Sequence, residues 1–232
     1  MLITGGGGKF CQYLKPLLPD GHFYDRSMLD ITDDAAVGRV VPNYDTIIHC
    51  AAFTSPPKVD ANPELAIASN IMGTSILVKH AIKNKCRFVY ISTDYVFDGE
   101  EGLYREEDPV NPVNRYAWSK LGGECAVRMM KENWVIIRCS MGPKPFPYDK
   151  AFTDQFTSRE TMEEIAKKVV KVAKSNFCGV VHLGGDRKSV YDYATSVSPE
   201  KVIQPISTRD MSFKLPKDTS LDCSFFNKEF LP

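Results

Sequence analysis

The chain has 232 residues, of which 43% are hydrophobic and 25% charged, values ordinary for a globular protein and not for a disordered or fibrous one. Its 29 lysines and arginines equal its 29 aspartates and glutamates, so no overall positive field predicts binding to nucleic acid. No apolar stretch approaches the roughly 20 residues that span a bilayer, and no basic segment precedes Met1. We therefore predict a cytoplasmic protein that does not bind membranes.

The cysteines do not form a recognisable framework. There are seven, an odd number, and no two of them are spaced C-x-x-C. This predicts neither a disulfide scaffold nor a zinc or other metal site, and most of the thiols are expected to be buried as small apolar side chains.

Predicted strands alternate with predicted helices along most of the chain. The strands cover residues 2–4, 22–25, 45–50, 87–93, 134–138 and 180–183. The helices cover residues 9–18, 32–40 with Thr32 as the N-cap, 63–84, 113–132 and 160–174. This alternation predicts an α/β fold of the Rossmann-like, doubly wound type, with a parallel sheet covered on both faces.

The length and the irregular C-terminal part predict one large domain with a small addition. Residues 1–142 are expected to form a dinucleotide-binding domain, which 160–185 complete. The remaining residues, 143–159 and 186–232, carry many prolines and little periodicity, and are expected to form a reduced substrate-binding cap.

A glycine-rich turn follows the first strand. Gly5 and Gly8 have the spacing of a dinucleotide fingerprint, with Cys11 in the place of its third glycine. Gly5 allows the chain to turn, and Gly8 allows backbone N–H groups to approach a pyrophosphate at the start of the helix. The alternative is a flexible loop, and the position between a strand and a helix favours the nucleotide site.

Asp25 and Arg26 stand at the end of the second strand, where such folds distinguish the two nicotinamide cofactors. A carboxylate accepts the ribose 2′-OH of NAD, whereas an arginine pairs with the 2′-phosphate of NADP. With Arg26 facing the ribose, NADP(H) is favoured and NAD(H) stays an alternative. A surface ion pair without function is the third interpretation.

Tyr116 and Lys120 are four residues apart and would face the same side of a helix. A neighbouring ammonium favours phenolate, so Lys120 is expected to lower the pKa of Tyr116 from its usual value of about 10. About one Y-x-x-x-K is expected by chance in a chain with 10 tyrosines, so an exposed helical pair is the competing interpretation. Thr93, at the carboxyl end of the fourth predicted strand, adds a hydroxyl that can hydrogen-bond a carbonyl oxygen, which favours ketone reduction.

The sequence resembles the dTDP-4-dehydrorhamnose reductase family of extended short-chain dehydrogenases/reductases. The matching segments, in order, are LITGGGG, DRSMLDITD, HCAAFT, NIMGT, ISTDYVFDG and NRYAWSKLGGE, with weaker matches in IRCS, DQFTSRET and GVVHLGGD. The resemblance implies NAD(P)H-dependent reduction of the 4-keto group of a nucleotide-activated 6-deoxysugar, as in dTDP-rhamnose biosynthesis. It leaves room for a homodimer.

The resemblance also implies roles by position. The catalytic residues would be Thr93, Tyr116 and Lys120. The cofactor would be contacted by Gly5, Gly8, Lys9, Phe10, Asp25, Arg26, Asp30, Ile31, Ala51, Ala52 and Asn70, together with Tyr116 and Lys120. The substrate would be contacted by Thr54, Thr93, Asp94, Tyr95 and Met141.

Several positions depart from the family pattern. Cys50 stands where the family has asparagine, Met141 where it has tryptophan, and two prolines occupy the 55–58 loop. The stretch between Gly142 and Asp154 is short, so the sugar and the nucleotide stay open. Two other functions share the fold: a nucleotide-sugar epimerase or dehydratase, and a non-catalytic NADP-binding regulatory subunit.

Overall fold

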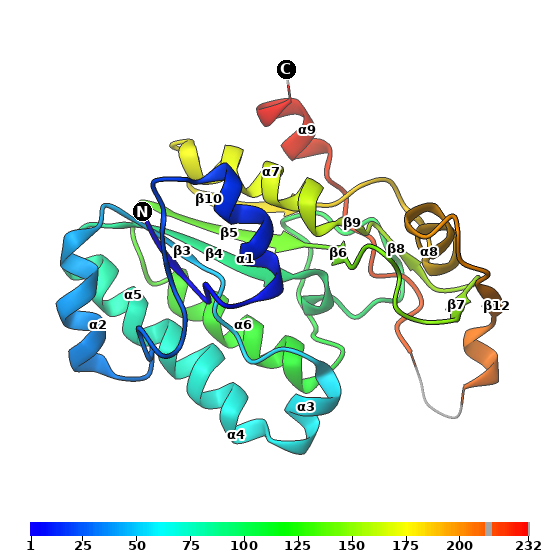
Figure 1. Ribbon diagram of the computed structural model, residues 1–232, viewed down its shortest axis with the longest axis horizontal. Coiled ribbons are helices and arrows are strands. Elements are labelled where there is room, and N and C mark those ends of the chain that lie inside the picture. The colour runs from blue at the N-terminus through cyan, green and yellow to red at the C-terminus, as the bar shows by residue number, and fades with distance from the viewer. Residues whose placement is uncertain (212–214, 232) are drawn as a thin grey trace.

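The computed structural model describes residues 1–211 and 215–231. Its centre is a six-stranded, fully parallel sheet in the order β10-β5-β4-β3-β1-β2 (Figure 1). These strands are β1 (Leu2–Thr4), β2 (His22–Tyr24), β3 (Thr46–His49), β4 (Arg87–Thr93), β5 (Trp134–Cys139) and β10 (Gly179–Leu183). The predicted doubly wound fold is confirmed, with β1 and β3 at the point where the chain changes direction across the sheet.

Helices cover both faces of the sheet (Figure 1). One layer contains α1 (Lys9–Leu14), α7 (Met162–Lys174) and α9 (Ser224–Phe230). The other contains α2 (Asp34–Val40), α4 (Pro63–Ala66), α5 (Thr74–Lys83) and α6 (Arg115–Val127). The cap of α2 differs from the prediction: Asp33, not Thr32, accepts the hydrogen bond of Ala36 N at 3.0 Å, because Thr32 is hydrogen-bonded to Asp30.

Neighbouring residues of the strands contribute to opposite cores, as the two-residue period of a strand requires. In β4, Phe88 and Tyr90 face the α2, α5 and α6 layer, whereas Val89 and Ile91 face α1 and α7. All four lie among the buried residues. A sheet that is apolar on both faces needs both helix layers, and this is why the sequence reads as a doubly wound fold.

The predicted helix 63–84 is one continuous helical stretch with an irregular middle. Between α4 and α5, residues Ile67–Gly73 form a π-helical segment. By length and hydropathy alone, Pro63–Lys83 could cross a membrane. Asn70, Leu77 and Val78 are buried, and Leu77 and Val78 belong to the core under the sheet. The opposite side of the stretch is exposed and carries Leu65, Ile67, Met72 and Ile82.

A smaller lobe stands beside the carboxyl edge of the sheet (Figure 1). It is built from β7 (Lys150–Phe152), β8 (Phe156–Thr157), β11 (Lys188–Ser189), β12 (Gln204–Ile206) and α8 (Val190–Val197). Its own core includes Phe146, Tyr193 and Ile203. The short strands β6 (Met141–Gly142) and β9 (Glu160–Thr161) pair where this lobe joins the sheet.

The last helix does not follow the boundary expected for the cap. Phe226 of α9 is fully buried in the core between the sheet and α7. Residues 224–230 therefore pack on the dinucleotide-binding layer, although the segment 186–232 was assigned to the cap. The rest of the domain division stays a prediction.

Candidate active site

The glycine turn lies at the carboxyl end of β1, against the end of β3. Gly5 has a φ of +76°, and a Cβ placed on it would lie 2.6 Å from Ala51 N. Gly8 N donates to Gly5 O at 2.8 Å and Gly8 caps α1 without a side-chain hydrogen bond. In the first turn of α1, Cys11 N donates to Gly8 O at 3.1 Å. The bare backbone at Gly5 and the exposed Gly7 and Gly8 fit a dinucleotide pyrophosphate.

The two side chains next to this turn differ in exposure. Lys9, the first residue of α1, is exposed, whereas Phe10 is partly buried and packs against the core. Ala51 and Ala52, which follow β3, are partly buried.

Two departures from the family pattern contact each other. The thiols of Cys11 and Cys50 are hydrogen-bonded, and this bond lowers the pKa of Cys11 while it raises the pKa of Cys50. Cys11 is buried and Cys50 is partly buried. The third fingerprint position is therefore filled by a small side chain that contacts Cys50, directly after β3.

The loop after β2 holds Asp25, Arg26 and Asp30. Asp25 Oδ1 accepts hydrogen bonds from Ser27 N (2.9 Å) and from Ser27 Oγ (2.6 Å), which lowers the pKa of Asp25. Arg26 extends into solvent, with 83% of its side chain exposed, and forms an ion pair with Asp30 at 3.6 Å. Asp25 thus stabilises its own turn, and Arg26 is available to a ligand after leaving a weak surface pair.

Ile31 is buried, where a Cβ on Gly73 would lie 2.7 Å from its side chain. Ile31 therefore packs close to Gly73 of the π-helical segment, from the loop after β2 that also holds Arg26 and Asp30.

The carboxyl end of β4 carries Thr93 and Asp94, both buried. Thr93 Oγ1 donates to Asp94 Oδ1 at 3.0 Å, while Asp94 Oδ2 accepts from Ser140 Oγ at 2.8 Å and from Thr219 Oγ1 at 3.2 Å. Burial raises the pKa of Asp94, against the opposing effects of Arg159 and these hydroxyls. Asp94 therefore connects the end of β4 to Ser140, directly after β5, and to the C-terminal segment; its expected contact with substrate stays a prediction.

Tyr116 lies in the first turn of α6, which Asn114 caps through a 2.9 Å hydrogen bond from Ala117 N. Burial raises the pKa of Tyr116, and the nearby Cys139 and Asp94 raise it further, so the phenol is protonated at neutral pH. The predicted lowering by Lys120 does not occur in this structure. The protonated phenol is the form that can donate a proton.

Lys120, one turn further along α6, is 3% exposed, and burial lowers its pKa to about 8. Its Nζ lies 4.1 Å from the ring centroid of Tyr90, a residue of β4. Lys120 is not among the groups that shift the pKa of Tyr116.

Asn70 joins three elements from within the π-helical segment. Its side-chain amide accepts from Phe53 N at 2.7 Å and donates to Phe53 O at 3.0 Å and to Ser119 Oγ at 2.8 Å. The side chain is fully buried. It fixes the loop after β3 against Ser119 of α6, the residue next to Lys120.

The residues expected at the substrate are less closely grouped. Tyr95 is partly buried at the end of β4 and acts electrostatically on Tyr116, as Asp94 does. Met141 is partly buried in β6, and Thr54 is exposed in the loop before α3 (Pro56–Ala61). The structure thus gathers Thr93, Asp94, Tyr95 and Tyr116 at one edge of the sheet, while Thr54 stands in a separate loop.

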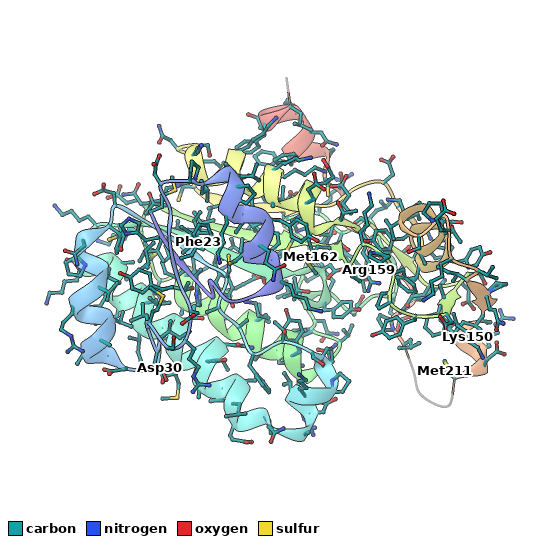
Figure 2. The ribbon with its side chains drawn as sticks, viewed as in Figure 1. Phe23, Asp30, Lys150, Arg159, Met162 and Met211 are labelled. Atoms are coloured by element: carbon teal, nitrogen blue, oxygen red, sulfur yellow. The ribbon has the colours of Figure 1, made fainter. Side chains whose placement is uncertain are left out.

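Sequence reasoning missed one residue of this group. Arg159, between β8 and β9, donates from Nη2 to Tyr95 Oη at 3.3 Å. Figure 2 shows it between the main sheet and the smaller lobe. The only sequence signal was its position in the weakly matching segment DQFTSRET.

Comparisons with known proteins agree with this arrangement. Residues 1–141 match the family described as RmlD substrate binding domain. The dTDP-4-dehydrorhamnose reductase of Aggregatibacter actinomycetemcomitans is 29% identical, over 89% of this chain and 80% of that protein. Methionine adenosyltransferase 2 subunit beta of Xenopus laevis is 38% identical, but over only 47% of this chain and 34% of that protein.

Two solved structures are similar over almost the whole chain. The dTDP-4-dehydrorhamnose reductase from Bacillus anthracis, in complex with NADP, has a TM-score of 0.86 and 25% identity, and covers 98% of this chain and 90% of that one. The dTDP-4-dehydrorhamnose reductase from Clostridium acetobutylicum has a TM-score of 0.88 and 27% identity, and covers 98% and 91%.

Proposed function

Because the chain belongs to the RmlD substrate binding domain family, we propose that it reduces the 4-keto group of a nucleotide-activated 6-deoxysugar with NADPH. The relatives named as dTDP-4-dehydrorhamnose reductases support the reaction class, and the NADP complex from Bacillus anthracis supports the cofactor. One observation of this chain carries the proposal. Asp94 and Tyr95, which directly follow Thr93 at the carboxyl end of β4, act electrostatically on the protonated Tyr116 of α6. The buried Lys120 is one turn further along α6, and the glycine turn follows β1, which is separated from β4 by β3 alone.

The proposed reduction needs a hydride donor, a proton donor and a hydrogen bond to the keto oxygen. Bound NADPH supplies the hydride to C4 of the sugar. Tyr116 gives its phenolic proton to the oxygen that becomes the hydroxyl, and its raised pKa keeps that proton in place until it is needed. Thr93 reaches the same oxygen when its O–H turns from Asp94 Oδ1 to the substrate.

The remaining roles follow from position. We assign the turn at Gly5 and Gly8 to the pyrophosphate and Arg26 to the 2′-phosphate. Lys120, held next to the Asn70 network, is assigned to the nicotinamide ribose. The other proposed cofactor contacts are Lys9, Phe10, Asp25, Asp30, Ile31, Ala51, Ala52 and Asn70. The proposed substrate contacts are Thr54, Asp94, Tyr95 and Met141.

The test is NADPH oxidation, followed by absorbance, with 4-keto-6-deoxysugars carried on dTDP or UDP. The parent should turn over at least one of them, and Tyr116→Phe should be slower by about 100-fold or more, because the proton donor is lost. Equal rates for Tyr116→Phe and the parent, or no turnover of any such sugar, would contradict the proposal. Turnover without added cofactor, by protein that purifies with bound NAD, would instead identify an epimerase or dehydratase.

A second candidate is a non-catalytic NADP-binding subunit. The similarity to methionine adenosyltransferase 2 subunit beta favours it, since that protein is by name a subunit of a larger enzyme. Co-purification with a larger enzyme, together with NADPH binding and no turnover of sugar nucleotides, would support this candidate.

For the reductase we propose a cytoplasmic location, where NADPH and sugar nucleotides are dissolved, and a homodimer as the oligomer to test.

A further inference from the structure

Arg159, which is partly buried, has fewer hydrogen-bond and ion-pair partners than the buried Arg138 and the exposed Arg187. Arg138 is bound to both oxygens of Glu124, with its Nη2 at 2.9 Å, and Arg187 Nε lies 2.6 Å from Asp218. Within residues 1–211 and 215–231, the Arg159 guanidinium makes one hydrogen bond, to Tyr95 Oη, and no ion pair within 4.0 Å. A guanidinium has five N–H donors, so most of its binding capacity is unused.

Asp94, which directly follows β4, acts electrostatically on Arg159 but forms no hydrogen bond or ion pair with it among the described residues. Both oxygens of Asp94 instead accept hydrogen bonds from the hydroxyls of Thr93, Ser140 and Thr219. Burial alone would lower the pKa of Arg159, but Tyr95, Asp94 and Tyr193 outweigh it and raise that pKa. The guanidinium is therefore a charged group, partly buried and short of acceptors.

The location of Arg159 relates it to the substrate. Tyr95 follows Thr93 at the end of β4, and Tyr193 belongs to α8 in the smaller lobe. Arg159 lies near both, so it stands where the reactive edge of the sheet meets that lobe (Figure 2). Lys188 Nζ, which donates to Arg159 O at 3.3 Å, adds a second positive charge to this segment.

A nucleotide sugar has its anionic group at a predictable distance from the reacting carbon. In a pyranose ring C1 lies across from C4, and C1 carries the diphosphate. With C4 at Thr93 and Tyr116, the diphosphate lies on the opposite side of the sugar ring, and the Arg159 guanidinium is available where the edge of the sheet meets the smaller lobe. Phosphate oxygens match the fork of an arginine in a bidentate pair.

We propose that Arg159, oriented by the Tyr95 hydroxyl, binds the diphosphate of the nucleotide-sugar substrate. The inference rests on the proposed function for the class of substrate. It gives the chain a means to hold the nucleotide although the stretch between Gly142 and Asp154 is short. Arg159 acts on the position and affinity of the substrate, and takes no part in proton or hydride transfer.

The experiment measures binding of dTDP and of thymidine, by calorimetry, to protein saturated with NADP⁺. The variants are Arg159→Met, which keeps the stem and loses the charge, and Arg159→Lys, which keeps the charge and loses the fork. Arg128→Met serves as the matched control, because Arg128 is exposed at the far end of α6. Thermal unfolding and NADP⁺ binding establish that each variant is folded.

Arg159→Met should weaken dTDP binding by about 10-fold or more, since a hydrogen-bonded charge pair is lost, and leave thymidine binding unchanged. Arg159→Lys should fall in between, and Arg128→Met should bind like the parent. In turnover assays KM should rise more than kcat falls. If Arg159→Met does not fold, Arg159→Lys decides the question, and parental dTDP affinity in it overturns the inference.

The two proposals fail in different ways. A parent that binds dTDP through Arg159 but reduces no 4-keto sugar contradicts the reductase function and leaves the diphosphate site standing. A parent that turns over while Arg159→Met keeps its dTDP affinity and KM contradicts the diphosphate site alone. No dTDP binding by the parent overturns the diphosphate site directly.

Discussion

At the scale of a single side chain, Arg26 is the residue that we propose distinguishes NADPH from NADH. It is the exposed member of a pair with Asp30, whereas Asp25 uses one oxygen to hold its own turn. We predict that Arg26→Ala weakens NADPH binding by about 10-fold or more and changes NADH binding little, because only NADPH carries the 2′-phosphate. Fluorescence titration of both cofactors measures this. Arg39→Ala, an exposed arginine in α2, is the control, and an equal loss for both cofactors would contradict the assignment.

The buried Lys120 makes the free energy of unfolding depend on pH. Its pKa is about 8 in the folded protein, against a usual value of about 10.4 in an unfolded chain. Below pH 8 both states carry the charge, and the folded state bears the full cost of burying it. Between about pH 8 and 10 the unfolded state binds more protons, so this group makes the free energy of unfolding rise with pH.

We therefore predict that the free energy of unfolding of Lys120→Met minus that of the parent is largest near pH 7. This difference should shrink by up to about 3 kcal/mol toward pH 10. Urea unfolding of cofactor-free protein at several pH values gives the difference directly. Other buried groups titrate in both proteins and cancel in it. Lys83→Met, at an exposed position in α5, should show a constant difference, and a constant difference for Lys120→Met would refute the buried ammonium.

At the scale of elements, the strands were predictable because their composition and position depend on burial on two faces. The strand at 87–93 was located to the residue, and the helix at 63–84 nearly so. The π-helical segment Ile67–Gly73 inside that helix was not predictable, since the side-chain period hardly changes over one turn. Yet this irregular turn is what aims Asn70 at both Phe53 and Ser119.

The elements of the smaller lobe were missed for a different reason. Its strands have two or three residues, too short for any period to be visible. Helix α8 had a usable signal: Ser189 and Asp192 form a capping box at its start. For the site, motifs pointed to Thr93, Tyr116 and Lys120, but Arg159 lies between β8, which pairs with β11, and β9, which pairs with β6, and only the tertiary structure reveals these pairings.

At the scale of the whole molecule, the C-terminal segment ties the lobe to the sheet. After the lobe, Thr219 bonds to Asp94 at the site, and α9 then inserts Phe226 into the core beneath α7. Phe226 also stacks on Phe230, with ring centroids 5.3 Å apart. The segment whose Thr219 bonds to Asp94 is therefore anchored by α9, which packs in the same helix layer as α1 and α7.

We predict that Phe226→Ala lowers the free energy of unfolding by about 3–5 kcal/mol, because it opens a cavity at a fully buried position. Leu231→Ala, at an end position that is 45% exposed, should cost less than about 1 kcal/mol and serves as the control. Urea unfolding followed by circular dichroism compares them. Equal, small losses in both variants would mean that α9 does not pack as described. A large loss in Phe226→Ala, with weaker dTDP binding in the fraction that stays folded, would indicate that the packing of the tail on the sheet also positions Asp94 and the residues around it.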